Sequence, residues 1–169
     1  MTSEYNYIWE PCSGEQFLAC FSADGGPNDD WIISPLLSGN PQTVSFQAKS
    51  VTDSYGLERY QLLYSLTGND PNDFIPLHTE PYLEAPVAWT EITTALPYGA
   101  RYFAIRCVSD NAFAFLVDDI VYMPGNGIPA AISPTGYNIY RDEIKINDSP
   151  VTERIYIDRP VGNDPAISC

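Results

Sequence analysis

The sequence predicts an all-β sandwich. Short alternating or apolar runs recur along the chain, and clusters of Gly, Pro, Asn and Asp separate them. No segment shows a convincing 3.6-residue period, so we do not expect helices. The 169 residues are 44% hydrophobic and include 11 glycines and 15 prolines, which indicates a turn-rich domain with a real core.

Seven runs have the length and composition of strands. The turns between them, such as SGNP at 38–41 and TGNDPND at 67–73, combine Gly and Asn, which tolerate unusual φ values, with Pro, which fixes φ. Pro35 lies inside the first run and indicates an edge strand or a bulge there. The expected strands span residues 31–37, 43–49, 59–66, 74–79, 87–94, 100–108 and 112–122.

Alternation assigns faces to these strands, because successive side chains point to opposite sides. We expect Phe103, Ile105, Phe115 and Val117 to be buried, and Glu91 to face solvent. A buried phenylalanine contributes far more to stability than a solvent-facing glutamate.

The composition changes after the seventh run. We divide the chain into a sandwich domain at 1–124, a Gly- and Pro-containing linker at 125–136 and a tail at 137–169. The tail holds two further strand-like runs, 137–142 and 151–158. At about 35 residues, it is too short to bury a core of its own.

Exposed apolar strand edges pair with whatever edge is available. We therefore expect the tail either to fold back on the sandwich domain or to associate with another copy through residues 137–158. The fold-back is the favoured alternative, because the linker is long enough to return but too short to reach far.

The charge excludes several partners. The chain has 22 acidic residues against 8 basic ones, for a net charge of -14. Such a field repels phosphate backbones, so we expect no nucleic-acid binding. No apolar run approaches the roughly 18 residues of a membrane span, so we expect no membrane insertion. Divalent cations are natural counter-ions, although acids also serve simply to keep a protein soluble.

The N-terminus lacks the basic and apolar regions of a signal peptide, so we expect either a cytosolic chain or a piece of a longer exported protein.

The cysteines Cys12, Cys20, Cys107 and Cys169 permit three disulfide pairings, and the sequence does not choose among them. Cys107 alternates with apolar residues and is expected to be a small core residue, while a bridge between Cys12 and Cys20 is possible.

Two adjacent carboxylates, Asp118 and Asp119, interrupt the apolar run AFAFLVDDIVYMP. In a regular strand one of them faces inward, on the side of Ala114 and Leu116, and the other outward, on the side of Phe115. A carboxylate that faces a core is costly unless it is hydrogen-bonded, paired or bound to a metal.

The sequence lacks most of the residues that common enzyme mechanisms need. His78 is the one histidine, so neither a Ser-His-Asp triad nor a His-rich zinc site can be assembled. A glycosidase needs two carboxylates about 5 to 9.5 Å apart, and no acid pair flanked by aromatic residues within a strand supports one. We predict that the chain is not an enzyme.

The aromatic residues divide into two groups. Tyr55 and Tyr82 lie in probable loops, where a tyrosine can stack on a sugar ring or anchor a protein contact. The others lie within or beside strands and are expected to be buried in the sandwich. They are Trp31, Trp89, Tyr60, Tyr64, Tyr98 and Tyr102.

An ordered set of motifs runs from Asp24 to Tyr122: DDWIISPLL, VSFQAKS, ERYQLLYSLTG, WTEITTALPYGARYFAIRCVS and FLVDDIVY. This set resembles the cleaved adhesin family, also described as choice-of-anchor J modules. The resemblance implies an antiparallel jelly-roll sandwich of the MAM or galactose-binding-like kind, in a secreted or cell-surface bacterial protein. The tail, GYNIYRDEIKINDSPVTERIYID, resembles part of a fibronectin type III module.

The family resemblance also implies structural calcium, held between the early acidic loop and the last strand. Carried over to this sequence, the ligands are Asp24, Asp29 and one of Asp118 and Asp119. Calcium takes six to eight oxygen ligands from carboxylates, amides and carbonyls, and ADGGPNDDW supplies such groups. The alternative is that Asp118 accepts hydrogen bonds from neighbouring backbone N–H groups.

The resemblance favours a noncatalytic extracellular module for adhesion or ligand binding, with a host or matrix protein or a glycan as partner. Two alternatives stay open. One is a carbohydrate-binding module attached to a larger secreted enzyme, and the other is a structural subunit that assembles through its strand-rich tail. Fold analogy alone does not decide among them.

Overall fold

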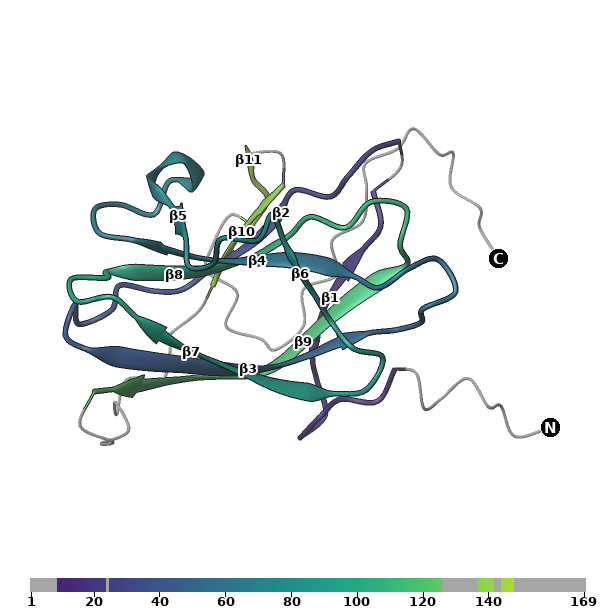
Figure 1. Ribbon diagram of the computed structural model, residues 1–169, viewed down its shortest axis with the longest axis horizontal. Helices are drawn as coiled ribbons and strands as arrows, with labels where there is room; N and C mark the ends of the chain where they lie inside the picture. Colours follow the sequence, from purple (N-terminus) through teal and green to yellow (C-terminus); the bar gives the residue numbers. More distant parts are fainter. Residues whose placement is uncertain (1–8, 24, 126–136, 142–143, 148–169) are drawn as a thin grey trace.

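The computed structural model describes residues 9–23, 25–125, 137–141 and 144–147, and these form two antiparallel sheets packed face to face (Figure 1). The all-β sandwich prediction is confirmed. The smaller sheet has the order β1-β9-β3-β7. Its strands are β1 (Leu18–Phe21), β3 (Gln42–Ser50), β7 (Thr90–Leu96) and β9 (Ala114–Pro124).

The larger sheet has seven strands in the order β11-β10-β2-β8-β4-β5, and β6 pairs with β4 off this path. A 3₁₀ turn at Pro71–Asp73 precedes β5. The strands are β2 (Asp30–Ile33), β4 (Arg59–Ser65), β5 (Ile75–Pro76), β6 (Leu83–Glu84), β8 (Tyr102–Cys107), β10 (Asn138–Arg141) and β11 (Ile144–Lys145). No helix in the described ranges has the length and apolar character needed to cross a membrane.

Each of the seven expected runs of the sandwich domain contains an observed strand, but two are much shorter than predicted. The first ends at Ile33, two residues before Pro35, and the fourth is reduced to Ile75–Pro76. Three short strands were not predicted, namely β1, β6 and β11, because two to four residues are too few to show alternation. The expected strand at 151–158 lies outside the described residues.

The main core lies between the two sheets and receives large side chains from both. The rings of Tyr60 and Phe115 stack with their centroids 5.3 Å apart, and Phe46 meets Tyr60 edge-on at 6.2 Å. Phe103 and Ile105 of β8 join this cluster. The predicted burial of Phe103, Ile105, Phe115 and Val117 is confirmed, and Glu91 is exposed as expected.

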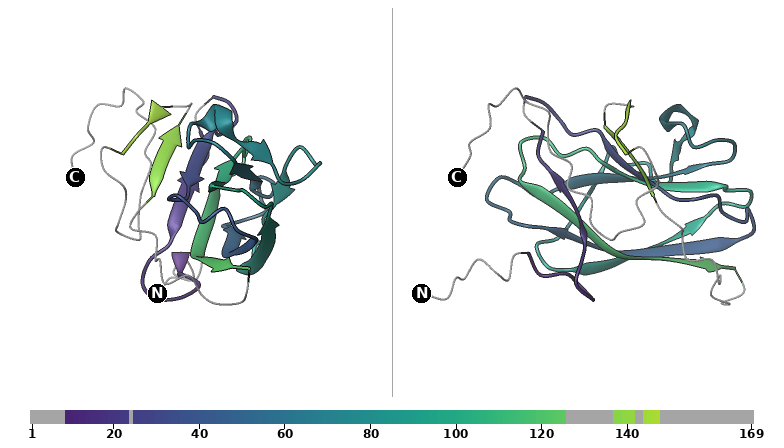
Figure 2. Two further views of the ribbon diagram at one scale, coloured as in Figure 1. Left: turned by 90° about the vertical axis from the view of Figure 1, so that its left-hand side faces the viewer. Right: turned by 180° about the vertical axis from the view of Figure 1, so that it is seen from behind.

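Strand β9 is buried on both faces over its first half. Phe115 and Val117 point into the inter-sheet core, while Ala114 and Leu116 belong to a separate apolar cluster. The prediction that Ala114 and Leu116 mark the inward side is therefore wrong. Their face is covered by the segment 9–21, which we call the N-terminal cover and which ends in β1 at the edge of the smaller sheet (Figures 1 and 2). The covering side chains are Trp9, Phe17, Ala19 and Phe21, together with Trp89.

The tail folds back on the sandwich. Strand β10 pairs with β2 in antiparallel register, with Ile139 opposite Ile32 and Tyr140 opposite Trp31. Figure 2 shows β10 and β11 continuing the larger sheet beyond β2. Ile139 is only 6% exposed, so the pairing buries apolar surface as well as backbone. The favoured fold-back prediction is confirmed for the part of the tail that the structure describes.

We expect Phe115→Ala to lower the free energy of unfolding by about 3 to 5 kcal/mol, because it removes a stacked ring from the core. Glu91→Ala serves as the control and should cost under about 0.5 kcal/mol, because Glu91 faces solvent. Urea denaturation measures both. Equal losses for the two variants contradict the face assignment.

A chain that ends at Pro124 should melt about 5 °C or more below the full chain, because it loses the buried Ile139 and uncovers the β2 edge. Light scattering should give the mass of one chain for both the full and the truncated protein. An unchanged melting temperature, or an oligomer that disappears on truncation, contradicts docking of the tail within one chain.

Candidate functional site

The two adjacent carboxylates lie at a β-bulge. Asp118 pairs with Gln47 on β3, yet Val121 pairs with Ser45, so β9 carries one residue more than β3 in this stretch. Asp119 adopts φ 48°, in the left-handed region that Asp tolerates better than most residues. The bulge breaks the alternation of the strand. The predicted opposite orientation of the two carboxylates is therefore wrong, because both reach the same residue, Ser13.

The aspartate pair fastens the N-terminal cover to β9. One oxygen of Asp118 accepts the backbone N–H groups of Cys12 and Ser13 at 2.9 and 3.2 Å. The other accepts the Asp119 N–H at 2.7 Å, and Asp119 accepts the Ser13 hydroxyl at 2.6 Å. Hydrogen bonds to a carboxylate are stronger than those between neutral groups. We call Asp118 and Asp119, with their bonds to residues 12 and 13, the aspartate latch.

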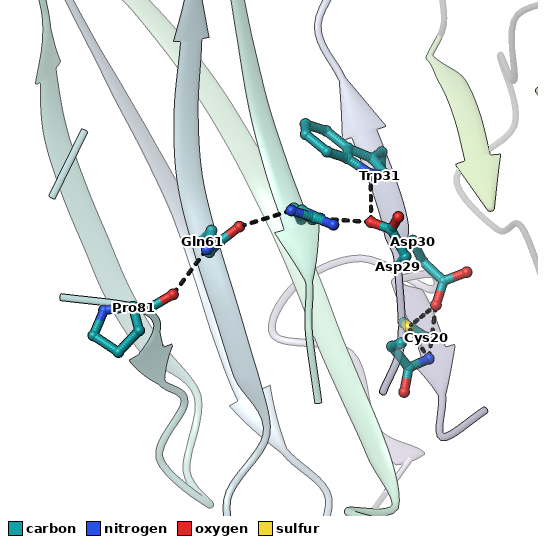
Figure 3. Close-up of polar contacts among 8 residues, drawn as sticks. Cys20, Asp29, Asp30, Trp31, Gln61 and Pro81 are labelled. Carbon is teal, nitrogen blue, oxygen red and sulfur yellow. Dashed lines mark hydrogen bonds and ion pairs between the residues drawn. The ribbon is translucent and has the colours of Figure 1, made fainter. Parts of the chain in front are cut away.

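The acidic loop before β2 is tied to the cover by a buried asparagine. Asn28 is 4% exposed, and its side-chain amide donates to the Phe21 carbonyl at 2.8 Å and to Asp30 at 2.7 Å. Its oxygen accepts the Ala23 N–H at 3.2 Å. Figure 3 shows Asp30 directed towards Cys20, whose sulfur lies 3.0 Å from Oδ2.

Asp29 belongs to a polar chain that crosses the outer face of the larger sheet (Figure 3). Its Oδ1 accepts Arg106 Nε at 2.5 Å and Trp31 Nε1 at 2.8 Å, and the guanidinium lies 4.9 Å from the centre of the Trp31 ring. Arg106 also donates to Gln61 at 3.3 Å, and Gln61 donates to the Pro81 carbonyl at 2.8 Å. Arg106 lies directly opposite Gln61 on one neighbouring strand and opposite Trp31 on the other. The register of the sheet therefore brings these polar side chains together.

The four predicted metal ligands are not brought together by the described residues. Asp24 lies outside those residues, Asp29 pairs with Arg106, and Asp118 and Asp119 form the latch. Within the described ranges, no group of three or more His, Cys, Asp or Glu side chains could hold a metal ion. As placed, the three described carboxylates do not fit a shared calcium site, because protein donors engage them. Calcium stays a prediction that rests on the family resemblance.

A row of aromatic rings lies on the surface where the cover meets the start of β9. Tyr55 is 67% exposed and Phe113 39% exposed, with ring centroids 6.4 Å apart. Phe113 in turn lies 6.1 Å from Trp9, which lies 5.7 Å from Phe21. We call Tyr55, Phe113, Trp9 and Phe21 the aromatic strip. Three chain segments contribute to it: the loop before β4, the entry to β9 and the N-terminal cover.

The backbone beneath the strip is held by a buried carboxyl group. Glu58 is 1% exposed, and its Oε1 accepts the Phe113 N–H at 2.7 Å. Burial raises the pKa of Glu58, while hydrogen bonds from Ser109, Phe113 and Ala114 oppose that rise. The Glu58 N–H donates to Ser50 Oγ at 2.9 Å, and that hydroxyl donates to the Ala85 carbonyl at 2.6 Å. These bonds fix the position of Phe113 relative to β3 and β4.

The aromatic predictions are confirmed in part. Tyr55 is exposed in a loop as expected, whereas Tyr82 is half-buried against the Arg59 guanidinium, 4.7 Å from its ring centre. Tyr98, which we expected to be buried, is 80% exposed because it follows the end of β7 in a turn. The sequence does not point to Trp9 or Phe113, because the contacts that Phe113 makes with Tyr55 and with Trp9 depend on tertiary structure.

A second feature is a cavity of about 320 Å³ at one end of the sandwich. Its walls are largely apolar and include Ile32, Val44 and Phe103. The Tyr122 hydroxyl on its wall contacts Ser38 Oγ at 2.7 Å and also the Gln42 side chain. These polar groups bond to one another, so the cavity offers a ligand mainly apolar contact.

The single histidine has a structural role. His78 Nε2 accepts the Leu62 N–H at 3.1 Å, and Nδ1 lies 2.8 Å from the Glu80 carbonyl oxygen. Both ring nitrogens are therefore used to hold the β4–β5 region. The described residues thus define the protein as a two-sheet antiparallel β-sandwich domain with exposed aromatic rings on its surface.

Comparison with known proteins places this sandwich in a family. No protein-family model matches the chain. Lys-gingipain W83 and Hemagglutinin A, both of Porphyromonas gingivalis, are 31% identical to it over 147 residues. Each match covers 77% of this chain but only 8% and 6%, respectively, of those much longer proteins.

Two solved structures are similar as well. The K3 cleaved adhesin domain of Lys-gingipain from the same organism shares 29% identity with a TM-score of 0.51, over 57% of this chain and 64% of that one. The K2 cleaved adhesin domain shares 25% identity with a TM-score of 0.53, over 66% and 73%. The chain belongs to the cleaved adhesin family, so the resemblance and the jelly-roll fold are confirmed.

The relatives are secreted or surface-associated proteins, and the predicted localisation is confirmed. The matched regions are adhesin domains, distinct from the protease domain of Lys-gingipain. The fibronectin type III resemblance of the tail is not tested by these comparisons and stays a prediction.

We expect the two latch residues to differ on substitution. Asp118→Ala leaves two backbone N–H groups without their acceptor and should cost about 1 to 3 kcal/mol in urea denaturation. Asp119→Gly loses the Ser13 bond but removes a side chain from a left-handed φ, so it should cost under about 1 kcal/mol. Equal costs contradict the assignment of Asp118 as the main acceptor.

The calcium prediction is tested by melting the chain in millimolar Ca²⁺ and again with excess chelator. A bound ion stabilises the native state by RT ln(1 + [L]/Kd), so chelation should lower the melting temperature. Asp24→Asn should reduce that response, whereas Asp110→Asn, at an exposed acid outside the predicted set, should preserve it. Identical melting temperatures with and without chelator contradict the calcium prediction.

Proposed function

We propose that the chain is a noncatalytic adhesion module of a secreted or cell-surface bacterial protein, and that it binds a protein ligand through the aromatic strip. Membership of the cleaved adhesin family supports adhesion, and one relative is named a hemagglutinin. The chain matches only a small part of each longer relative, so the proposal rests on the adhesin domains alone.

The observation that carries the proposal is the exposure of the strip. Tyr55 at 67% and Phe113 at 39% present ring surface to solvent in one continuous row with Trp9. Tyrosine and tryptophan supply large contact area at low conformational cost and are enriched among the residues that dominate binding energy. Single exposed rings are common, but adjoining rings from three segments form a larger contact area.

The strip is held in place before a ligand arrives. Glu58 fixes the Phe113 backbone, and the aspartate latch fixes the cover near Trp9. A surface that is already ordered loses less conformational entropy on binding. The net charge of -14 favours a partner with a basic surface and disfavours sulfated glycans and other polyanions.

Glycan binding is the second candidate, because ring faces also stack on neutral sugars and the strip offers several faces in a row. In the alternative of a structural subunit, by contrast, the chain assembles with other copies through the strands of its tail. The described part of the tail already pairs with β2 of the same chain, which favours the binding role over assembly.

The test measures binding of the chain to immobilised extracellular matrix proteins and to a glycan array. Tyr55→Ala should weaken protein binding about tenfold or more, because it removes an exposed anchor. The matched control is Tyr98→Ala, at an 80% exposed tyrosine of a different loop, and it should bind as the parent does. Rising salt should slow association with a basic partner.

Binding that is confined to neutral glycans and lost in Tyr55→Ala moves the assignment to the second candidate. Protein binding that Tyr55→Ala leaves intact overturns the role of the strip. Loss of binding in both tyrosine variants also overturns the role of the strip, because it points to a general effect on the fold.

A further inference from the structure

Two cysteines from opposite sheets meet inside the sandwich. Cys20 lies on β1 of the smaller sheet and Cys107 on β8 of the larger sheet. Cys107 is 3% exposed and belongs to the main core, and Cys20 packs against that same cluster. Both line one small cavity of about 40 Å³ between the sheets.

The position of Asp30 shows how close the two side chains come. Asp30 is the direct cross-strand partner of Cys107, and its Oδ2 lies 3.0 Å from the Cys20 sulfur. The amide of Asn28 also reaches that sulfur, at 3.3 Å. The Cys20 side chain therefore extends from β1 across to the β2–β8 pair, towards the position that Cys107 occupies on β8. In the structure both residues are thiols.

The compartment of the chain makes this contact significant. Proteins secreted or displayed at a cell surface meet oxidising conditions, in which adjacent thiols form and retain disulfides. Both residues line the same small cavity, which leaves room for their side chains to change rotamer. We propose that Cys20 and Cys107 form a disulfide that joins the two sheets of the exported protein.

The reaction is a two-electron oxidation. Each thiol loses its proton, one S–S bond forms, and a disulfide oxidant such as oxidised glutathione accepts the two electrons and two protons and is cleaved into two thiols. The closed loop of about 90 residues contains every strand from β2 to β8, and a bridge over so long a loop restricts the unfolded chain strongly.

The order of folding and oxidation follows from the environment of Cys20. The Cys107 thiol, burial and the Asp30 carboxylate raise the pKa of the Cys20 thiol well above its usual value. Because the thiolate is the reactive form, the closed core slows oxidation. The bridge therefore forms while the chain folds, and the experiment refolds the protein under oxidising conditions.

The test unfolds the full chain, refolds it in a mixture of reduced and oxidised glutathione, and maps it by proteolysis and mass spectrometry without reduction. The expected product joins the Cys20 peptide to the Cys107 peptide, with the mass of two hydrogens missing. Reduction of the refolded chain should lower the melting temperature by roughly 10 °C. Cys12→Ser, at an exposed cysteine, should keep both results, and Cys20→Ser should abolish the response to reductant.

Peptide mapping uses the unaltered sequence, so it decides the question even if a variant fails to fold. A Cys20 linked to Cys12 or to Cys169 overturns the proposal. So does a refolded chain in which both Cys20 and Cys107 react with an alkylating reagent after unfolding without reduction.

Discussion

The outer face of the smaller sheet must be covered, and the rest of the structure depends on how the chain does so. Val51, Ala114 and Leu116 on that face are almost fully buried, with Leu116 at 0% exposure. The N-terminal cover excludes water from them, and the aspartate latch holds the cover where the bulge of β9 presents two carboxylates on one side. A charged pair in an apolar strand thus stabilises the apolar face beside it.

The other features of the molecule follow from this covering. The strip includes Trp9 because the cover brings that ring to Phe113. The cover also ends in β1, which carries Cys20 across the sandwich edge towards Cys107 on the other sheet. The proposed binding surface and the proposed disulfide therefore both depend on the docking of one segment of about a dozen residues.

The sequence predicts the positions of the long strands and the burial of Phe103 and Phe115, because both lie in runs with the composition of strands. It assigns Ala114 and Leu116 to the wrong side of β9, because both faces of that strand are apolar over its first half. It does not predict β1, because four residues without flanking alternation carry no such signal. It also misplaces Asp118 and Asp119, because a single extra residue in a ladder is a property of the paired strands. The strip and the meeting of the two cysteines are likewise contacts between distant segments, which a period along one segment cannot show.

The docking of the cover is tested most directly by amide hydrogen exchange of the intact chain, followed residue by residue. If the cover docks as described, the Cys12 and Ser13 N–H groups, which donate to Asp118, should be protected together with the amides of β1. Exchange of Cys12 and Ser13 at the rate of an unstructured peptide, while the amides of β9 remain protected, contradicts this docking.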